Sequence, residues 1–237
     1  MSRRALLDVT TSILGACLVA AALVIIWIAR LQVGGQGVYV SELGAPGMPT
    51  AQIFEIALLL IVGGGCLVGF ASMDIRSRVR WLAIWTPSVS LWIASGFFLV
   101  ASQVTCKYGC PLPITNSITG TTIDWQDLTH IVCATAAFVV ACFAMIQVAF
   151  AHDHRALARF SLVLAIAVGA ISGLGGILSL ARFGTDVGAD AELTATTLAI
   201  AWVVVYGCMI AVGRTRVQRA EGGDIRSSSR LASPTST

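Results

Sequence analysis

The stretch that decides the fold runs from residue 52 to residue 80 and reads QIFEIALLLIVGGGCLVGFASMDIRSRVR. After Glu55 the stretch holds an unbroken run of apolar and small residues, which is long enough to cross a bilayer as an α-helix. It then ends in three arginines, Arg76, Arg78 and Arg80. A basic segment directly after an apolar run is typical of a cytoplasmic loop. The stretch therefore predicts a membrane-spanning helix whose second end faces the cytoplasm.

The rest of the chain repeats this pattern. Hydrophobic residues make up 57% of its 237 residues and charged residues 11%, whereas soluble domains have about 25% charged residues. A bilayer accommodates that much apolar surface, but a soluble fold of this size cannot bury it. We therefore predict an all-α polytopic membrane protein, a bundle of six transmembrane helices. The expected spans are 9–30, 52–72, 81–102, 127–150, 158–181 and 191–213.

The basic residues divide unequally between the two sides of this arrangement. Twelve of the fifteen Lys and Arg residues fall on the side of the two chain ends, and three fall on the other side. Cytoplasmic segments carry the excess of Lys and Arg, so both termini are expected in the cytoplasm of a bacterial inner membrane. Residues 1–213 then form the membrane domain, and the polar, serine-rich tail 214–237 is expected to be disordered. The outward connections are 31–51, 103–126 and 182–190.

Polar side chains that the orientation does not explain gather at the outer ends of the second, third and fourth spans. Asp127 and His130 are three residues apart and would share one helix face. Ionisable groups at membrane depth are costly and often functional, although near a span end each group can instead be solvated separately. We predict a polar pocket roofed by the first two outer loops, with separate solvation as the alternative. The candidate residues are Ser41, Glu42, Glu55, Gln103, Asp127 and His130.

Cysteine and histidine spacing argues for a disulfide and against a metal centre. Cys106 and Cys110 share one exported connection, where a disulfide between them is expected because that compartment is oxidising. His152 and His154 lie on the cytoplasmic side, roughly 33 Å along a helix from His130. We therefore expect no metal and no cofactor. Catalytic residues remain unassigned, because the sequence has neither a GxSxG motif nor a phosphate-binding loop.

Glycine and proline positions predict how the helices pack. The pairs Gly65 with Gly69 and Gly169 with Gly173 are spaced as in helix faces that approach closely. They are compatible with a helix-mediated homo- or hetero-oligomer. Pro87 lies inside the expected third span, where it predicts a kink.

With these residues in view, the chain resembles the domain-of-unknown-function family 998, which comprises six-helix bacterial membrane proteins. The resemblance covers about residues 10–213 and rests on the order and spacing of three short motifs. These are Val40-Ser41-Glu42-Leu43-Gly44, Cys106 followed by Gly109-Cys110-Pro111, and His130 at the opening of the fourth span. Lys107 stands in the neighbourhood where the family typically has an acidic residue. The resemblance implies a fold and a location, but no activity.

Three classes of function fit these observations. The favoured class is a non-enzymatic protein that binds a membrane lipid or a protein partner at its outer face, and no nucleic acid is expected as a partner. The second class is a small proton-coupled transporter that uses Glu55, Asp127 and His130 as a relay. The third is a membrane enzyme that acts on an exported lipid headgroup. A connected cluster of those three side chains would favour the second or third class.

Overall fold

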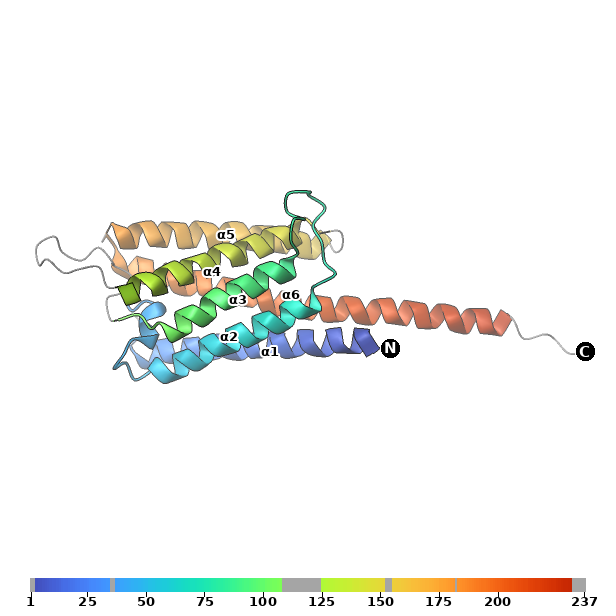
Figure 1. Ribbon diagram of the computed structural model, residues 1–237, viewed down its shortest axis with the longest axis horizontal. Coiled ribbons are helices and arrows are strands. Elements are labelled where there is room, and N and C mark those ends of the chain that lie inside the picture. The colour runs from blue at the N-terminus through green and yellow to red at the C-terminus, as the bar shows by residue number, and fades with distance from the viewer. Residues whose placement is uncertain (1–2, 35–36, 108–124, 152–154, 182, 232–237) are drawn as a thin grey trace, which may run out of the picture.

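The computed structural model describes residues 3–34, 37–107, 125–151, 155–181 and 183–231 (Figure 1). Within these ranges the only β-structure is an isolated bridge between Ser77 and Ala151, so the all-α prediction is confirmed. The elements in chain order are α1 (Arg3–Gln32), the 3-10 helix η1 (Ser41–Gly44), α2 (Ala51–Ala71), α3 (Pro87–Gln103), α4 (Trp125–Ala149), α5 (Arg155–Leu180) and α6 (Thr185–Leu231).

The six helices lie side by side along one axis and alternate in direction (Figure 1). Each helix packs against its neighbours in the sequence, and α1 also packs against α6, so the bundle closes on itself. One end of the bundle carries η1 and the starts of α2, α4 and α6, and we call it the His130 end. The other end carries the start of α1 and the end of α2, and we call it the Asp74 end.

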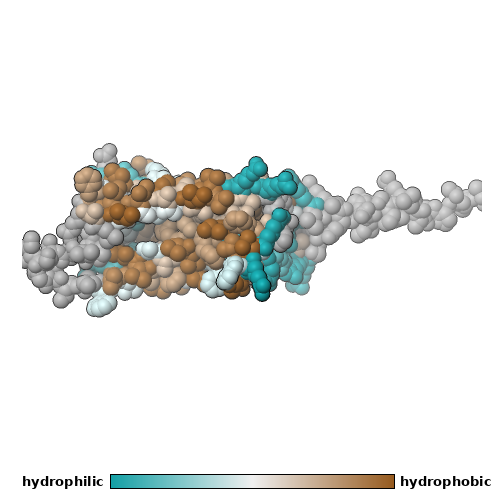
Figure 2. All heavy atoms as spheres, turned by 90° about the horizontal axis from the view of Figure 1, so that it is seen from above, coloured by the Kyte–Doolittle hydropathy of each residue, from teal (hydrophilic) through white to brown (hydrophobic). Residues whose placement is uncertain are grey.

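Five of the helices, α1, α2, α4, α5 and α6, are long and apolar enough to cross a membrane. Their surface agrees, because apolar residues cover most of the bundle in the face that Figure 2 shows, and a hydrophilic band borders them on one side. Val163, Ile166 and Ile177 of α5 are each more than 60% exposed, as expected of side chains that face lipid. These features support a multi-pass membrane protein, while the sixth span and the orientation stay predictions.

The third helix differs from its prediction. It begins at Pro87 rather than near residue 81, and its 17 residues extend over about 26 Å. The Thr86 side chain accepts a hydrogen bond from the Val89 backbone N–H, and Pro87 occupies the first turn, where proline fits without losing a helical bond. The predicted kink is therefore wrong, because Pro87 starts the helix instead of interrupting it.

Glycines let α2 approach both of its neighbours. A Cβ atom added at Gly64 would lie 2.6 Å from the Gly15 carbonyl oxygen of α1, and one at Gly69 would lie 2.7 Å from Nε1 of Trp92 on α3. A larger residue at position 64 would force α1 and α2 apart, and one at position 69 would displace the Trp92 side chain. By contrast, a Cβ atom added at Gly169 or Gly173 would have no atom of a neighbouring element within 4 Å. The pair on α5 therefore leaves an open face, and an oligomer through it stays a prediction.

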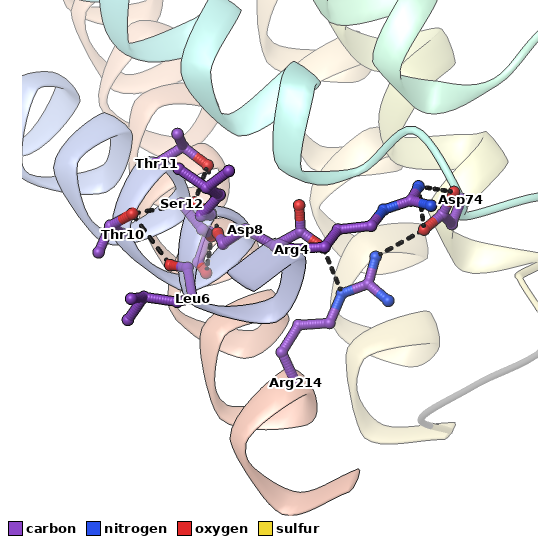
Figure 3. A network of polar contacts seen from close by, with 10 residues as sticks. Arg4, Leu6, Asp8, Thr10, Thr11, Ser12, Asp74 and Arg214 are labelled. Atoms are coloured by element: carbon purple, nitrogen blue, oxygen red, sulfur yellow. Dashed lines mark hydrogen bonds and ion pairs between the residues drawn. The ribbon is translucent and has the colours of Figure 1, made fainter. Parts of the chain in front are cut away.

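Charged side chains tie three helices together at the Asp74 end (Figure 3). Asp74, just after α2, is 3.1 Å from Arg4 of α1 and 3.0 Å from Arg214 of α6. Arg214 also lies 3.3 Å from Asp8, which is buried. Two cations and two carboxylates therefore satisfy one another. Beyond Arg214, α6 continues to Leu231 into the segment expected to be a disordered tail, and it projects past the bundle (Figure 1).

Candidate functional site

A partly open cavity lies between five of the six helices and reaches η1. Its walls extend from His130 to Ala141 on α4 and from Glu192 to Val203 on α6, which is about 16 Å along each helix. The cavity has a volume of about 90 Å³, counted as the space that the centre of a water molecule can occupy. One water molecule needs only about 10–15 Å³ by this measure. The site is therefore elongated along the bundle axis.

The lining of this cavity is mostly apolar, and its ionisable groups lie at one end. Aliphatic, aromatic and alanine side chains from α1, α2, α3, α4 and α6 make up the walls. His130 and Glu192 both lie at the His130 end, close to the starts of α4 and α6. The polar lining residues are Ser41, Ser95, His130, Glu192 and Thr196.

One ring nitrogen of His130 binds the end of α3, and the other has no partner among the described residues. Its side chain is 5% exposed, and its Nδ1 lies 3.0 Å from the Ala101 carbonyl oxygen and 2.7 Å from that of Val104. Carbonyl oxygens only accept hydrogen bonds, so Nδ1 carries the proton and donates it. The last carbonyls of a helix have no partner within the helix, and His130 therefore caps the end of α3. In the neutral ring Nε2 is then an acceptor, and the described residues give it no partner.

Glu192 holds η1 over the end of the cavity. Its Oε2 accepts a hydrogen bond of 2.9 Å from the Val40 backbone N–H, and its Oε1 accepts one of 3.3 Å from that of Ser41. The buried Arg30 supports the preceding residues, since it donates to the Val38 carbonyl oxygen and lies 3.1 Å from Asp190. The carboxylate thus fixes a roof that is 150 residues away in the sequence.

A second and smaller pocket lies beside this cavity, and its volume by the same measure is about 10 Å³. His130 and Ser41 line both spaces, whereas Glu55 lines only the smaller one. Glu55 is exposed, and within the described part of the chain it forms no hydrogen bond or ion pair. The structure therefore brings three of the predicted residues together.

The other predicted residues lie elsewhere at this end. Gln103 is exposed and donates to the Ser102 hydroxyl, and Asp127 accepts a 2.9 Å hydrogen bond from the Lys107 backbone N–H. Neither residue lines the two spaces described above. Glu42 is buried and accepts a hydrogen bond from the Tyr39 backbone N–H. Their functional roles stay predictions.

The predicted disulfide falls only partly on described residues. Cys106 is buried and lines the smaller pocket next to His130. Cys110 lies outside the described residues, so the pairing stays a prediction. Among the residues that the structure describes, no three His, Cys, Asp or Glu side chains gather closely enough to hold a metal ion.

Sequence reasoning missed Glu192 and Arg30 as parts of this site. The only signal was weak. Each is a charged residue close to the end of a predicted span, at the side of the bundle that has only three basic residues. A charge in such a place calls for a partner, and here the partners are Asp190 and backbone groups of residues 38, 40 and 41.

Comparison with known proteins gives a family and nothing more specific. No curated protein and no solved structure matches the chain. A family model described as "Protein of unknown function (DUF998)" matches residues 13–209, which include every lining residue of the cavity. Because the match covers most of the 237 residues, the chain belongs to the DUF998 family.

Proposed function

We propose that the protein binds an amphipathic molecule with a long alkyl chain, such as a membrane lipid, in the cavity between its helices. The observation that carries this proposal is the polarity of the cavity. A mostly apolar lining extends along the bundle, and an imidazole and a carboxylate lie at one end of it. Ligand sites are typically apolar spaces with a few polar groups that fix the orientation of the ligand.

The dimensions of the cavity suit a single chain. Spread over about 16 Å, the available room corresponds to a channel roughly 5 Å wide once the radius of water is added. Carbon atoms pack at 3.5–4.0 Å from their neighbours, so one alkyl chain fits this width. An extended chain advances roughly 1.3 Å per methylene, from its C–C bond length. The tube therefore matches a chain of about a dozen carbons.

The excess of basic residues on the side of the two chain ends supports a cytoplasmic Asp74 end in a bacterial inner membrane. The His130 end would then face outward, and the ligand's polar group would lie near the outer surface. The relay of the transport alternative requires contacts among Glu55, Asp127 and His130. In the described structure, the carboxylate of Asp127 instead binds the Lys107 backbone, and His130 binds the end of α3. Binding is therefore the better-supported function.

A variant that fills the tube tests this proposal. Ala134 lines the cavity one turn deeper than His130, and Ala134→Phe would place a ring across the tube. Ala170→Phe is the matched control, because Ala170 is exposed on the lipid-facing side of α5. We expect native mass spectrometry to find a retained lipid on the wild type and on Ala170→Phe, but not on Ala134→Phe. Equal retention by all three proteins would show that the cavity does not hold the lipid.

A further inference from the structure

We propose that the cavity selects ligands whose polar group donates a hydrogen bond, a hydroxyl or an ammonium, over ligands that end in a carboxylate or a phosphate. This inference rests on the proposed function, and it names the chemical class of the ligand. It follows from which atoms the His130 end presents to the cavity and from which charges are missing there.

The first step concerns His130. Its Nδ1 is committed as a donor to the two carbonyl oxygens at the end of α3. Nε2 lies on the other side of the ring, has no partner among the described residues, and belongs to a side chain that is 5% exposed and lines the cavity. Nε2 is therefore an acceptor that the described residues leave available. A donor on the ligand would give it a hydrogen-bond partner.

The second step concerns Glu192. Both of its oxygens already accept backbone N–H groups from the roof residues Val40 and Ser41. Each carboxylate oxygen has a second lone pair, so Glu192 also offers acceptors and no donor while it is ionised. The hydroxyls of Ser41, Ser95 and Thr196 can donate or accept, and they do not reverse this bias.

The third step concerns positive charge. No lysine or arginine is among the described residues that line the cavity. Arg30, a buried basic side chain at this end of α1, is committed to the Val38 carbonyl oxygen and Asp190. Anionic groups in proteins are held by Arg, Lys or several backbone N–H groups, and the backbone N–H groups of Val40 and Ser41 are taken by Glu192. An anion at this end would meet acceptors without a counter-charge.

Photolabelling with matched ligands tests this selectivity. The full-length protein in lipid nanodiscs is exposed to three probes with chains of about a dozen carbons and a diazirine near the far end. They are a primary alcohol, a primary amine and a carboxylic acid, applied at a pH at which the acid is ionised. Labelling of the cavity-lining stretches 134–141 and 192–203 is measured relative to labelling of the exposed face of α5.

We expect the alcohol and the amine each to label the cavity stretches at least about tenfold more than the acid, because one net hydrogen bond accounts for roughly two- to tenfold and an unpaired anion adds to the difference. If all three probes label the cavity equally, the selectivity is refuted while lipid binding stands. If none labels the cavity above α5, the proposed function itself fails.

A substitution at His130 tests whether its Nε2 is the atom that accepts the hydrogen bond from the ligand. In His130→Asn the side-chain nitrogen is at the δ position, like Nδ1, so it can still donate to the carbonyls of Ala101 and Val104 while Nε2 is lost. We expect unchanged thermal stability and a several-fold loss of the preference for the alcohol. Thr129→Ala is the control, since Thr129 is exposed and bonds only within its own helix. A His130→Asn protein that folds normally and keeps the full preference would refute the role of Nε2.

Discussion

Removing the carboxylate of Glu192 should loosen the roof of the cavity without unfolding the bundle. This side chain accepts hydrogen bonds from the backbone N–H groups of Val40 and Ser41, at 2.9 and 3.3 Å. A hydrogen bond to a charged group contributes about 1.5–3 kcal/mol. We take the lower value, since the longer of the two bonds is near the limit of good geometry. Glu192→Ala then costs about 3 kcal/mol and Glu192→Gln, which keeps one acceptor, about 1.5 kcal/mol.

Amide hydrogen exchange measures this loss directly, because exchange reports the free energy of local opening. Each 1.4 kcal/mol corresponds to a factor of ten, so the amides of Val40 and Ser41 should exchange about a hundredfold faster in Glu192→Ala and about tenfold faster in Glu192→Gln. Amides in the middle of α2 should keep their wild-type rates. Thr194→Ala is the matched control, because Thr194 is exposed on the same helix and bonds only to the Asp190 carbonyl.

The outcome separates two explanations of the roof. If the roof amides exchange at wild-type rates in Glu192→Ala, then Arg30 and the turn geometry of η1 hold the segment without the carboxylate. The assignment of Glu192 as the anchor would then be refuted. If exchange rises throughout the bundle, the substitution has destabilised the whole fold, and Glu192 is a core residue rather than a local anchor.

Three further predictions concern the rest of the molecule. Reporter fusions at Ser117 and at the C-terminus should report opposite compartments, because three predicted spans separate them, and matching compartments would refute the six-span model. Mass mapping of the unreduced protein should find Cys106 linked to Cys110, whereas alkylation of both thiols without reductant would count against the pair. Gln147→Leu should lower the free energy of unfolding by about 2 kcal/mol, at roughly 0.6 kcal/mol for each hydrogen bond in a membrane protein. The buried Gln147 side chain makes three such bonds, and an unchanged stability would show that they contribute nothing net.

The helices were predictable because hydropathy acts locally. The second, fourth and fifth spans were placed within three residues of their observed ends, as a comparison of 52–72 with Ala51–Ala71 illustrates. The prediction of the third span failed at its start, where the local cap of Thr86 and Pro87 acts together with a contact from a distant part of the sequence. Residues 81–86 are partly apolar, but the Gln147 amide of α4 donates to the carbonyls of Leu82 and Trp85 and holds them outside the helix. No local pattern contains that contact.

The site was predictable in location and not in composition. The skew of polar residues toward one end of the bundle directed attention to His130, which does line the cavity. Glu192 escaped because its partners, Val40 and Ser41, are about 150 residues away, and a lone acidic residue near a span end has the same local signature as one solvated by water. The packing of α6 against α1 brings Glu192 close to Val40 and Ser41. This proximity depends on the fold and has no local sequence pattern.

A comparison of the two ends of the bundle shows why the His130 end is the better candidate for function. At the Asp74 end, two arginines and two aspartates neutralise one another, so the network stabilises the junction of three helices and leaves no strong acceptor unpaired within it. At the His130 end, Glu192 and Arg30 are committed to backbone groups of the roof, and His130 is committed on one side only. Ligand sites are typically apolar spaces with a few polar groups that fix the orientation of the ligand. The His130 end has both parts, a mostly apolar cavity and an acceptor at Nε2 without a partner among the described residues. The Asp74 end has only a network of ion pairs that stabilises the fold.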